Sequence, residues 1–166
     1  MQNILIPTDF TAQSLQFVSK TAAALQGEKI NIVLFHAFNL PDDIVDLMFI
    51  SREKVHQGLV SDEFRNQCRK LKNLYFDTIH SIHVKYMYGS TVRMFKNFAD
   101  ANTIDMIVLP GDLRLQLPHK YSFDPVPLLK KAGIKTITSP EAPPAKVWIT
   151  TEIKVKEAES AQLTRI

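Results

Sequence analysis

The stretch Asn3-Ile4-Leu5-Ile6-Pro7-Thr8-Asp9, near the start of the chain, decides the fold class. Its apolar residues follow one another without interruption, which is typical of a strand buried on both faces of a sheet. Apolar residues at helical spacing follow over residues 15–25, with Thr11 available as the cap and Gly27 placed to end the helix. A second apolar run over residues 29–36 completes a β-α-β unit, which implies two parallel strands.

The same alternation continues to residue 138. Further strand patterns occupy residues 79–86, 105–110 and 134–138, and helical patterns precede each of them. Five strands joined by helices predict an α/β fold, a doubly wound five-stranded parallel sheet with helices on both faces.

The region between the second and third strands is less regular. We expect a short helix over the apolar run from Ile44 to Ile50, capped by Asp42 or Asp43, and then one longer helix from Val55 to Leu71. The sequence leaves open whether the apolar run packs on its own sheet or against another subunit.

A change of pattern near residue 140 divides the chain. Residues 1–140 form one predicted domain, and Pro143 and Pro144 interrupt any regular element after it. Residues 146–155 alternate between polar and apolar side chains, which predicts an extra strand at a sheet edge. We therefore interpret residues 141–166 as a C-terminal extension, either an edge strand or a strand exchanged in a dimer.

Composition excludes several classes of function. The 166 residues suit a single domain, and no two of the five glycines lie closer than 22 residues, which excludes a glycine-rich phosphate loop. A net charge of +3 gives no strongly basic face, and the densest basic cluster, residues 65–72, is interpreted as a solvated helix face. Nucleic acid is therefore not expected as a partner.

Membrane insertion and secretion are not expected either. The longest apolar run is far shorter than the roughly 20 residues that span a bilayer, and the N-terminus lacks the basic segment of a signal peptide. The single cysteine, Cys68, excludes a disulfide framework and suits a reducing compartment. We expect a cytoplasmic protein.

The sequence nominates no catalytic residue and no metal ligands. His80 and His83 are three residues apart, so on a strand they face opposite sides of the sheet. No nucleophile elbow and no zinc-binding histidine motif occurs. An enzyme is the less favoured interpretation.

Five segments in register resemble the universal stress protein family over residues 2–140. They are Ile4 to Thr11, Ile32 to Ala37, Tyr88 to Ser90, Asp105 to Leu109, and Lys130 to Gly133. The resemblance implies an adenine-nucleotide α-hydrolase-like fold and a homodimer that pairs through the last sheet strand.

The nucleotide motif of the family is missing. ATP-binding members follow their fourth strand with Gly-x2-Gly-x9-Gly-Ser/Thr, whereas only Gly111 remains here and Ser122 is the one small residue near the end of the motif. Asp112 would also bring a negative charge beside the phosphates. We expect no cofactor, and ATP or AMP is disfavoured, although Arg114, His119 and Lys120 offer side chains that could bind a phosphate.

A candidate ligand site still follows from the fold, because ligands of open α/β sheets bind beyond the carboxyl ends of the strands. The residues assigned to it are Pro7, Thr8, Asp9, His36, Ala37, Gly111, Arg114 and Ser122. Two of them have alternative interpretations: Asp9 as a helix cap or charge partner, and His36 as a partly buried residue at a strand end.

Two hypotheses for function follow. The leading one is a non-enzymatic, homodimeric stress-response or regulatory interaction module, in which the last strand and the extension form the dimer contact. The alternative is a small-ligand or adenine-nucleotide-binding protein that uses a remodelled pocket at the strand ends.

Overall fold

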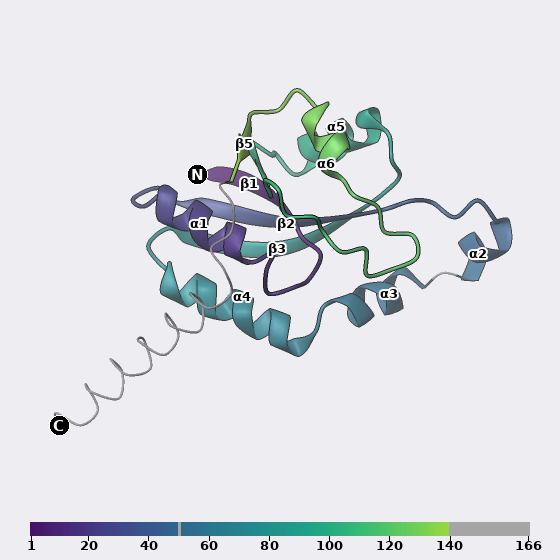
Figure 1. Cartoon of the computed structure of the whole chain (residues 1–166), viewed down its shortest axis with the longest axis horizontal. Helices are drawn as coiled ribbons and strands as arrows, with labels where there is room; N and C mark the ends of the chain where they lie inside the picture. Colours follow the sequence, from purple (N-terminus) through teal and green to yellow (C-terminus); the bar gives the residue numbers. More distant parts are fainter. Residues whose placement is uncertain (50, 140–166) are drawn as a thin grey trace.

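The computed structural model describes residues 1–49 and 51–139, and its centre is one parallel sheet (Figure 1). The strands are β1 (Gln2–Pro7), β2 (Ile30–Phe38), β3 (Ile79–Tyr88), β4 (Met106–Leu109) and β5 (Thr136–Thr138). Their order is β3-β2-β1-β4-β5, so the chain builds outward from β1 in one direction and then in the other. The predicted doubly wound sheet is confirmed. The predicted strand within residues 146–155 lies outside the described residues.

Helices cover both faces of the sheet. Helices α1 (Gln16–Ala24) and α4 (Asp62–Leu74) pack on one face, and α5 (Val92–Ala101) and α6 (Val126–Lys130) pack on the other. Figure 1 shows α5 and α6 above the strands and α4 below them. Strand β1 illustrates why both faces must be covered, since Ile4 and Ile6 point into the first core and Leu5 into the second. All three side chains are buried, as the continuous apolar run predicted.

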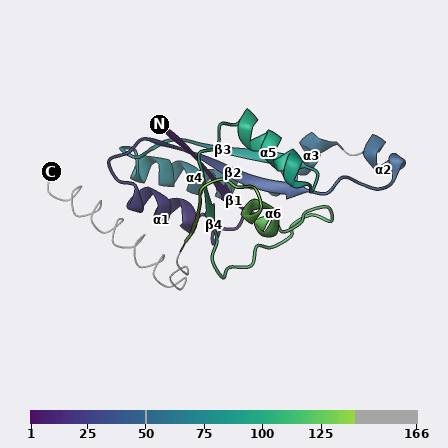
Figure 2. The same ribbon diagram turned by 90° about the horizontal axis from the view of Figure 1, so that it is seen from above.

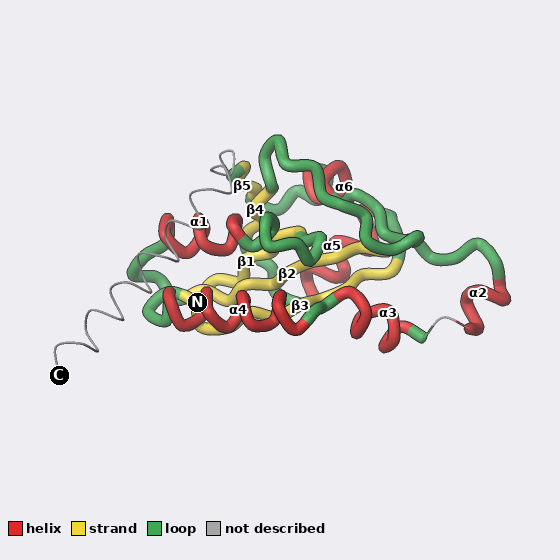
Figure 3. The backbone as a smooth tube through the Cα atoms, turned by 60° about the horizontal axis from the view of Figure 1, so that its bottom comes forward, coloured by secondary structure: helices red, strands yellow, loops and turns green. Residues whose placement is uncertain are grey.

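The long helix expected over residues 55–71 is wrong, because the chain forms two helices there. Helix α3 (Arg52–Leu59) ends before an extended residue, Val60, and α4 then starts anew; Figure 3 shows a loop between them. The Ser61 hydroxyl accepts a hydrogen bond from the Phe64 amide (3.1 Å), and two acidic residues follow it in the first turn. This capping sequence, rather than Gly58, sets the position of the break.

Helix α2 (Ile44–Phe49) forms as expected, and the Asp43 carboxylate accepts a hydrogen bond from the Val45 amide (2.8 Å). Figures 1 and 2 both place α2 at the far end of the molecule, beyond α3 and away from the centre of the sheet. Ile44, Met48 and Phe49 are 72%, 76% and 80% exposed. These three apolar side chains therefore remain largely exposed, whereas Asp46 of the same helix contacts Lys120 and Tyr121 of the loop after β4.

Candidate functional site

The strand ends bring most of the predicted site residues together. Pro7 is the last residue of β1, Thr8 and Asp9 follow it, and the Thr8 amide still donates to the Phe35 carbonyl of β2 (2.9 Å). His36 and Ala37 lie near the end of β2, and Gly111 lies two residues beyond β4. These positions share the carboxyl edge of the sheet because the strands are parallel.

His36 connects this edge to the loop that follows β4. Its Nδ1 lies 2.8 Å from the Thr8 carbonyl oxygen, and its Nε2 lies 2.8 Å from the Ser122 hydroxyl. A carbonyl can only accept, so the ring proton is on Nδ1, and Nε2 accepts from the hydroxyl. Burial lowers the pKa of His36 below its usual value, against the opposing effects of the Thr8 carbonyl and Asp9, which keeps the ring neutral.

Asp9 fastens the same loop at a second point. One carboxylate oxygen accepts a hydrogen bond from the Gln116 amide (2.8 Å), and the other accepts from the amide and hydroxyl of Thr11 (3.1 and 2.5 Å). Asp9 is only 5% exposed. Its carboxylate thus caps the turn after β1 and also holds a segment 107 residues away in the sequence.

Backbone bonds complete the attachment of the loop. The Asn39 amide donates to the Tyr121 carbonyl (2.7 Å), the Phe123 amide donates to the Ala37 carbonyl (3.3 Å), and Ser122 forms an antiparallel bridge with Phe38. We call the contacts of Asp9 with Gln116 and of His36 with Ser122 the loop clasp. The segment that would hold phosphates in the resembled family is here tied to the strand ends.

The other two loop residues of the predicted site lie differently. Gly111 adopts φ +59°, and a Cβ atom added there would lie 2.7 Å from the Ser139 carbonyl oxygen, so the loop passes close to the end of β5. Arg114 is exposed on the loop surface, unlike Asp9, His36 and Ser122, which are buried. Lys120, by contrast, pairs with Asp46 of α2 (3.6 Å), and Asp46 also accepts a hydrogen bond from the Tyr121 hydroxyl.

Aromatic rings surround the clasp, and sequence reasoning did not identify them. The ring of Phe10 lies 4.9 Å from His36 on one side, and Phe38 lies 4.9 Å from His36 on another. Phe38 also stacks on Tyr88 of the neighbouring strand (5.1 Å). The alternate spacing of aromatic residues in β2 and β3 was the available signal, because residues two apart share a sheet face.

Ser122 and His36 have the distance of a nucleophile and its base, a pairing that the sequence did not reveal across 86 residues. Catalysis would also need substrate access and free donors for an oxyanion. Ser122 is only 6% exposed, its amide donates to the His119 carbonyl, and the next amide donates to Ala37. The pair therefore acts as a buried structural contact in this structure.

Within residues 1–49 and 51–139, no group of three histidine, cysteine or acidic side chains is arranged to hold a metal ion. In the same part of the chain, no helix is long and apolar enough to cross a membrane.

The sequence and the structure give different results when they are compared with known proteins. No family model and no curated protein matches the sequence. Among solved structures, the universal stress protein UspA from Lactobacillus plantarum superposes with a TM-score of 0.54 at 17% identity, covering 84% of this chain and 97% of that one. The chain has the universal stress protein fold.

Two more structures share this fold. A universal stress protein family member from Burkholderia pseudomallei has a TM-score of 0.51 at 10% identity, covering 84% of this chain and 96% of that one. A hypothetical protein has a TM-score of 0.55 at 19% identity, covering 86% and 97% respectively. The shared fold thus covers nearly the full length of the three solved structures and most of this chain. The resemblance seen in the sequence is confirmed for the fold.

Proposed function

We propose that this chain is a universal stress protein of the cytoplasm that works as a non-enzymatic homodimeric interaction module. The observation that carries the proposal is the loop clasp. The polar side-chain atoms of Asp9, His36 and Ser122 form hydrogen bonds between the strand ends and the loop after β4. Each of these residues is at most 6% exposed. The edge of the sheet where ligands of such folds bind is therefore occupied by the chain itself.

The edge of the sheet opposite β3 supports a role in association. Strand β5 is the terminal strand of the described sheet, and all three of its residues are exposed. Ile137, at its centre, is 44% exposed. A terminal strand offers unpaired backbone groups to another chain, and the apolar side chain adds area that a second copy would bury.

We expect light scattering at micromolar concentration to give the mass of a dimer for the wild-type chain and that of a monomer for Ile137→Lys. The substitution would place a charge in the interface, where burying it without a partner is unfavourable. Phe76→Lys is the matched control, since Phe76 is 68% exposed outside β5 and its substitution should leave the dimer intact.

The role of residues 141–166 in the dimer can be measured at the same time. Trp148 is the only tryptophan of the chain, so its emission reports on this extension. Dilution should shift the emission of the wild type and not that of Ile137→Lys. A wild-type chain that stays monomeric, or an Ile137→Lys chain that stays dimeric, contradicts pairing through β5.

The alternative function is binding of an adenine nucleotide or another small ligand at the strand ends. Exposed Arg114 supports it, because its guanidinium is available on the loop that covers the site. Binding there would require the Asp9–Gln116 and His36–Ser122 hydrogen bonds to open, which lowers the affinity by the cost of opening.

Calorimetric titration with ATP, ADP and AMP separates the two functions. Under the leading proposal we expect no saturable heat for any of the three nucleotides. Saturable binding that is weakened by Arg114→Gln, and unchanged by Arg93→Gln on the surface of α5, would instead establish the alternative.

A further inference from the structure

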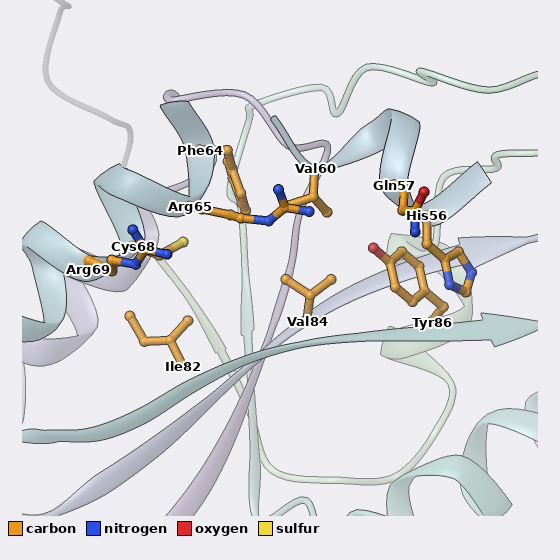
Figure 4. A pocket seen from close by; sticks show the side chains of 10 residues that line it. All are labelled: His56, Gln57, Val60, Phe64, Arg65, Cys68, Arg69, Ile82, Val84 and Tyr86. Carbon is orange, nitrogen blue, oxygen red and sulfur yellow. The ribbon is translucent and has the colours of Figure 1, made fainter. Parts of the chain in front are cut away.

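A groove of about 410 Å³ lies between the edge strand β3 and the helices α3 and α4 (Figure 4). Ile82, Val84 and Tyr86 form its floor, because alternate residues of a strand share a face. Phe64 and Cys68, one turn apart on α4, form its wall. These side chains are apolar for most of their surface, and the volume lies in the range of small-molecule sites.

Two arginines stand above the apolar floor. Figure 4 shows the side chains of Arg65 and Arg69 beside the groove, and none of the ten residues that line it is acidic. Arg65 Nη1 contacts Asp62 (3.0 Å), whose side chain is 94% exposed, so this ion pair is weak. A guanidinium has five N–H donors, which leaves Arg65 able to bind an anion.

One end of the groove carries polar groups on aromatic rings. The rings of Tyr86 and His56 stack at 3.6 Å, and His56 Nε2 lies 2.8 Å from the Tyr88 hydroxyl, which fixes both rings. In Figure 4 the Tyr86 hydroxyl points along the groove on the side of Val84 and Arg65. Burial raises the pKa of Tyr86 to about 12, so the hydroxyl keeps its proton and can donate to an anion.

We propose that this groove binds a medium-chain fatty acid, with its carboxylate between Arg65 and the Tyr86 hydroxyl and its aliphatic chain along Phe64, Val84 and Ile82. The arginines select an anion over a cation, and the apolar floor selects a single charge with a long apolar body over a compact polar anion. The groove shares no lining residue with the loop clasp or with β5, so the proposal stands or fails independently of the proposed function.

The test uses octanoate and the full chain. Cys68 is the only cysteine, it lies in the groove wall, and burial raises its pKa to about 11, so its alkylation by N-ethylmaleimide is slow and can be followed by mass spectrometry. Octanoate at ten times its dissociation constant, measured by calorimetry, should slow the alkylation about tenfold. Octylamine, with the same chain and the opposite charge, and acetate, with the same charge and almost no chain, should give no protection.

Two variants locate the bound molecule. Arg65→Gln should weaken octanoate binding about tenfold or more, because it removes a charge-assisted hydrogen bond, whereas Arg93→Gln on α5 should leave it unchanged. Val84→Phe should abolish binding by filling the floor, with the thermal midpoint confirming that the variant is folded. The proposal is overturned if octanoate gives no saturable protection, if octylamine or acetate protects equally, or if Arg65→Gln binds as the wild type does.

Discussion

Replacing His36 with alanine is expected to lower the free energy of unfolding by about 3–5 kcal/mol. The change removes the imidazole ring, which leaves its two partners, the Thr8 carbonyl and the Ser122 hydroxyl, buried without that hydrogen bond. It also opens a cavity between the rings of Phe10 and Phe38. Urea denaturation measures the loss, and hydrogen exchange should show faster exchange at the Gln116 amide as the loop loosens.

The control for this prediction is His83→Ala, because His83 is exposed on β3 and its replacement should change stability by less than about 0.5 kcal/mol. The two histidines also differ in their effect on pH dependence. Since burial lowers the pKa of His36 in the folded state, the unfolded state binds more protons as the pH falls below about 6.5, and stability falls with it.

Between about pH 7.5 and pH 5.5, the wild type should therefore lose stability, and His36→Ala should lose less. The variant keeps some dependence, because burial also lowers the pKa of His56 and of His119. A loss below about 1 kcal/mol for His36→Ala at pH 7.5, or an unchanged pH dependence, would contradict the buried His36–Ser122 contact.

Gly111→Ala is expected to cost about 2–4 kcal/mol, from two separate causes. A residue with a Cβ is strained at the φ of +59°, and the added atom would lie 2.7 Å from the Ser139 carbonyl oxygen. That oxygen cannot easily retreat, because the Ser139 amide donates to the Leu109 carbonyl (2.9 Å) and holds the backbone beside β4.

Gly133→Ala separates the two causes. Gly133 has a similar φ of +74°, but a Cβ there meets nothing within 4 Å, so only the backbone strain of about 1–2 kcal/mol applies. Urea denaturation of the two variants should show the larger loss for Gly111→Ala. Equal losses would show that the loop after β4 does not approach β5 as closely as described.

The candidate site illustrates what a sequence can predict. Placing Thr8, Asp9 and His36 at one edge needed only the parallel arrangement of β1 and β2, which short connections and apolar runs imply. Whether that edge is open to a ligand depended on Gln116 and Ser122, which bind Asp9 and His36. These partners lie 107 and 86 residues apart in the sequence. No local pattern encodes such a pairing, and of the two aromatic rings beside His36 only Phe38 shares its strand, whereas Phe10 lies in the turn after β1.

The strand pattern of residues 3–9, together with the four strand patterns and the helical patterns that follow it, determined the parallel sheet and its two helical layers. The spacing of apolar residues along the chain is a local property, so it can be found in the sequence alone. Tertiary structure alone decided that the loop after β4 covers the strand ends and that β3, α3 and α4 enclose a groove. These features arise where distant segments pack together, since the contact energy between them depends on their relative position in space and not on their order in the chain.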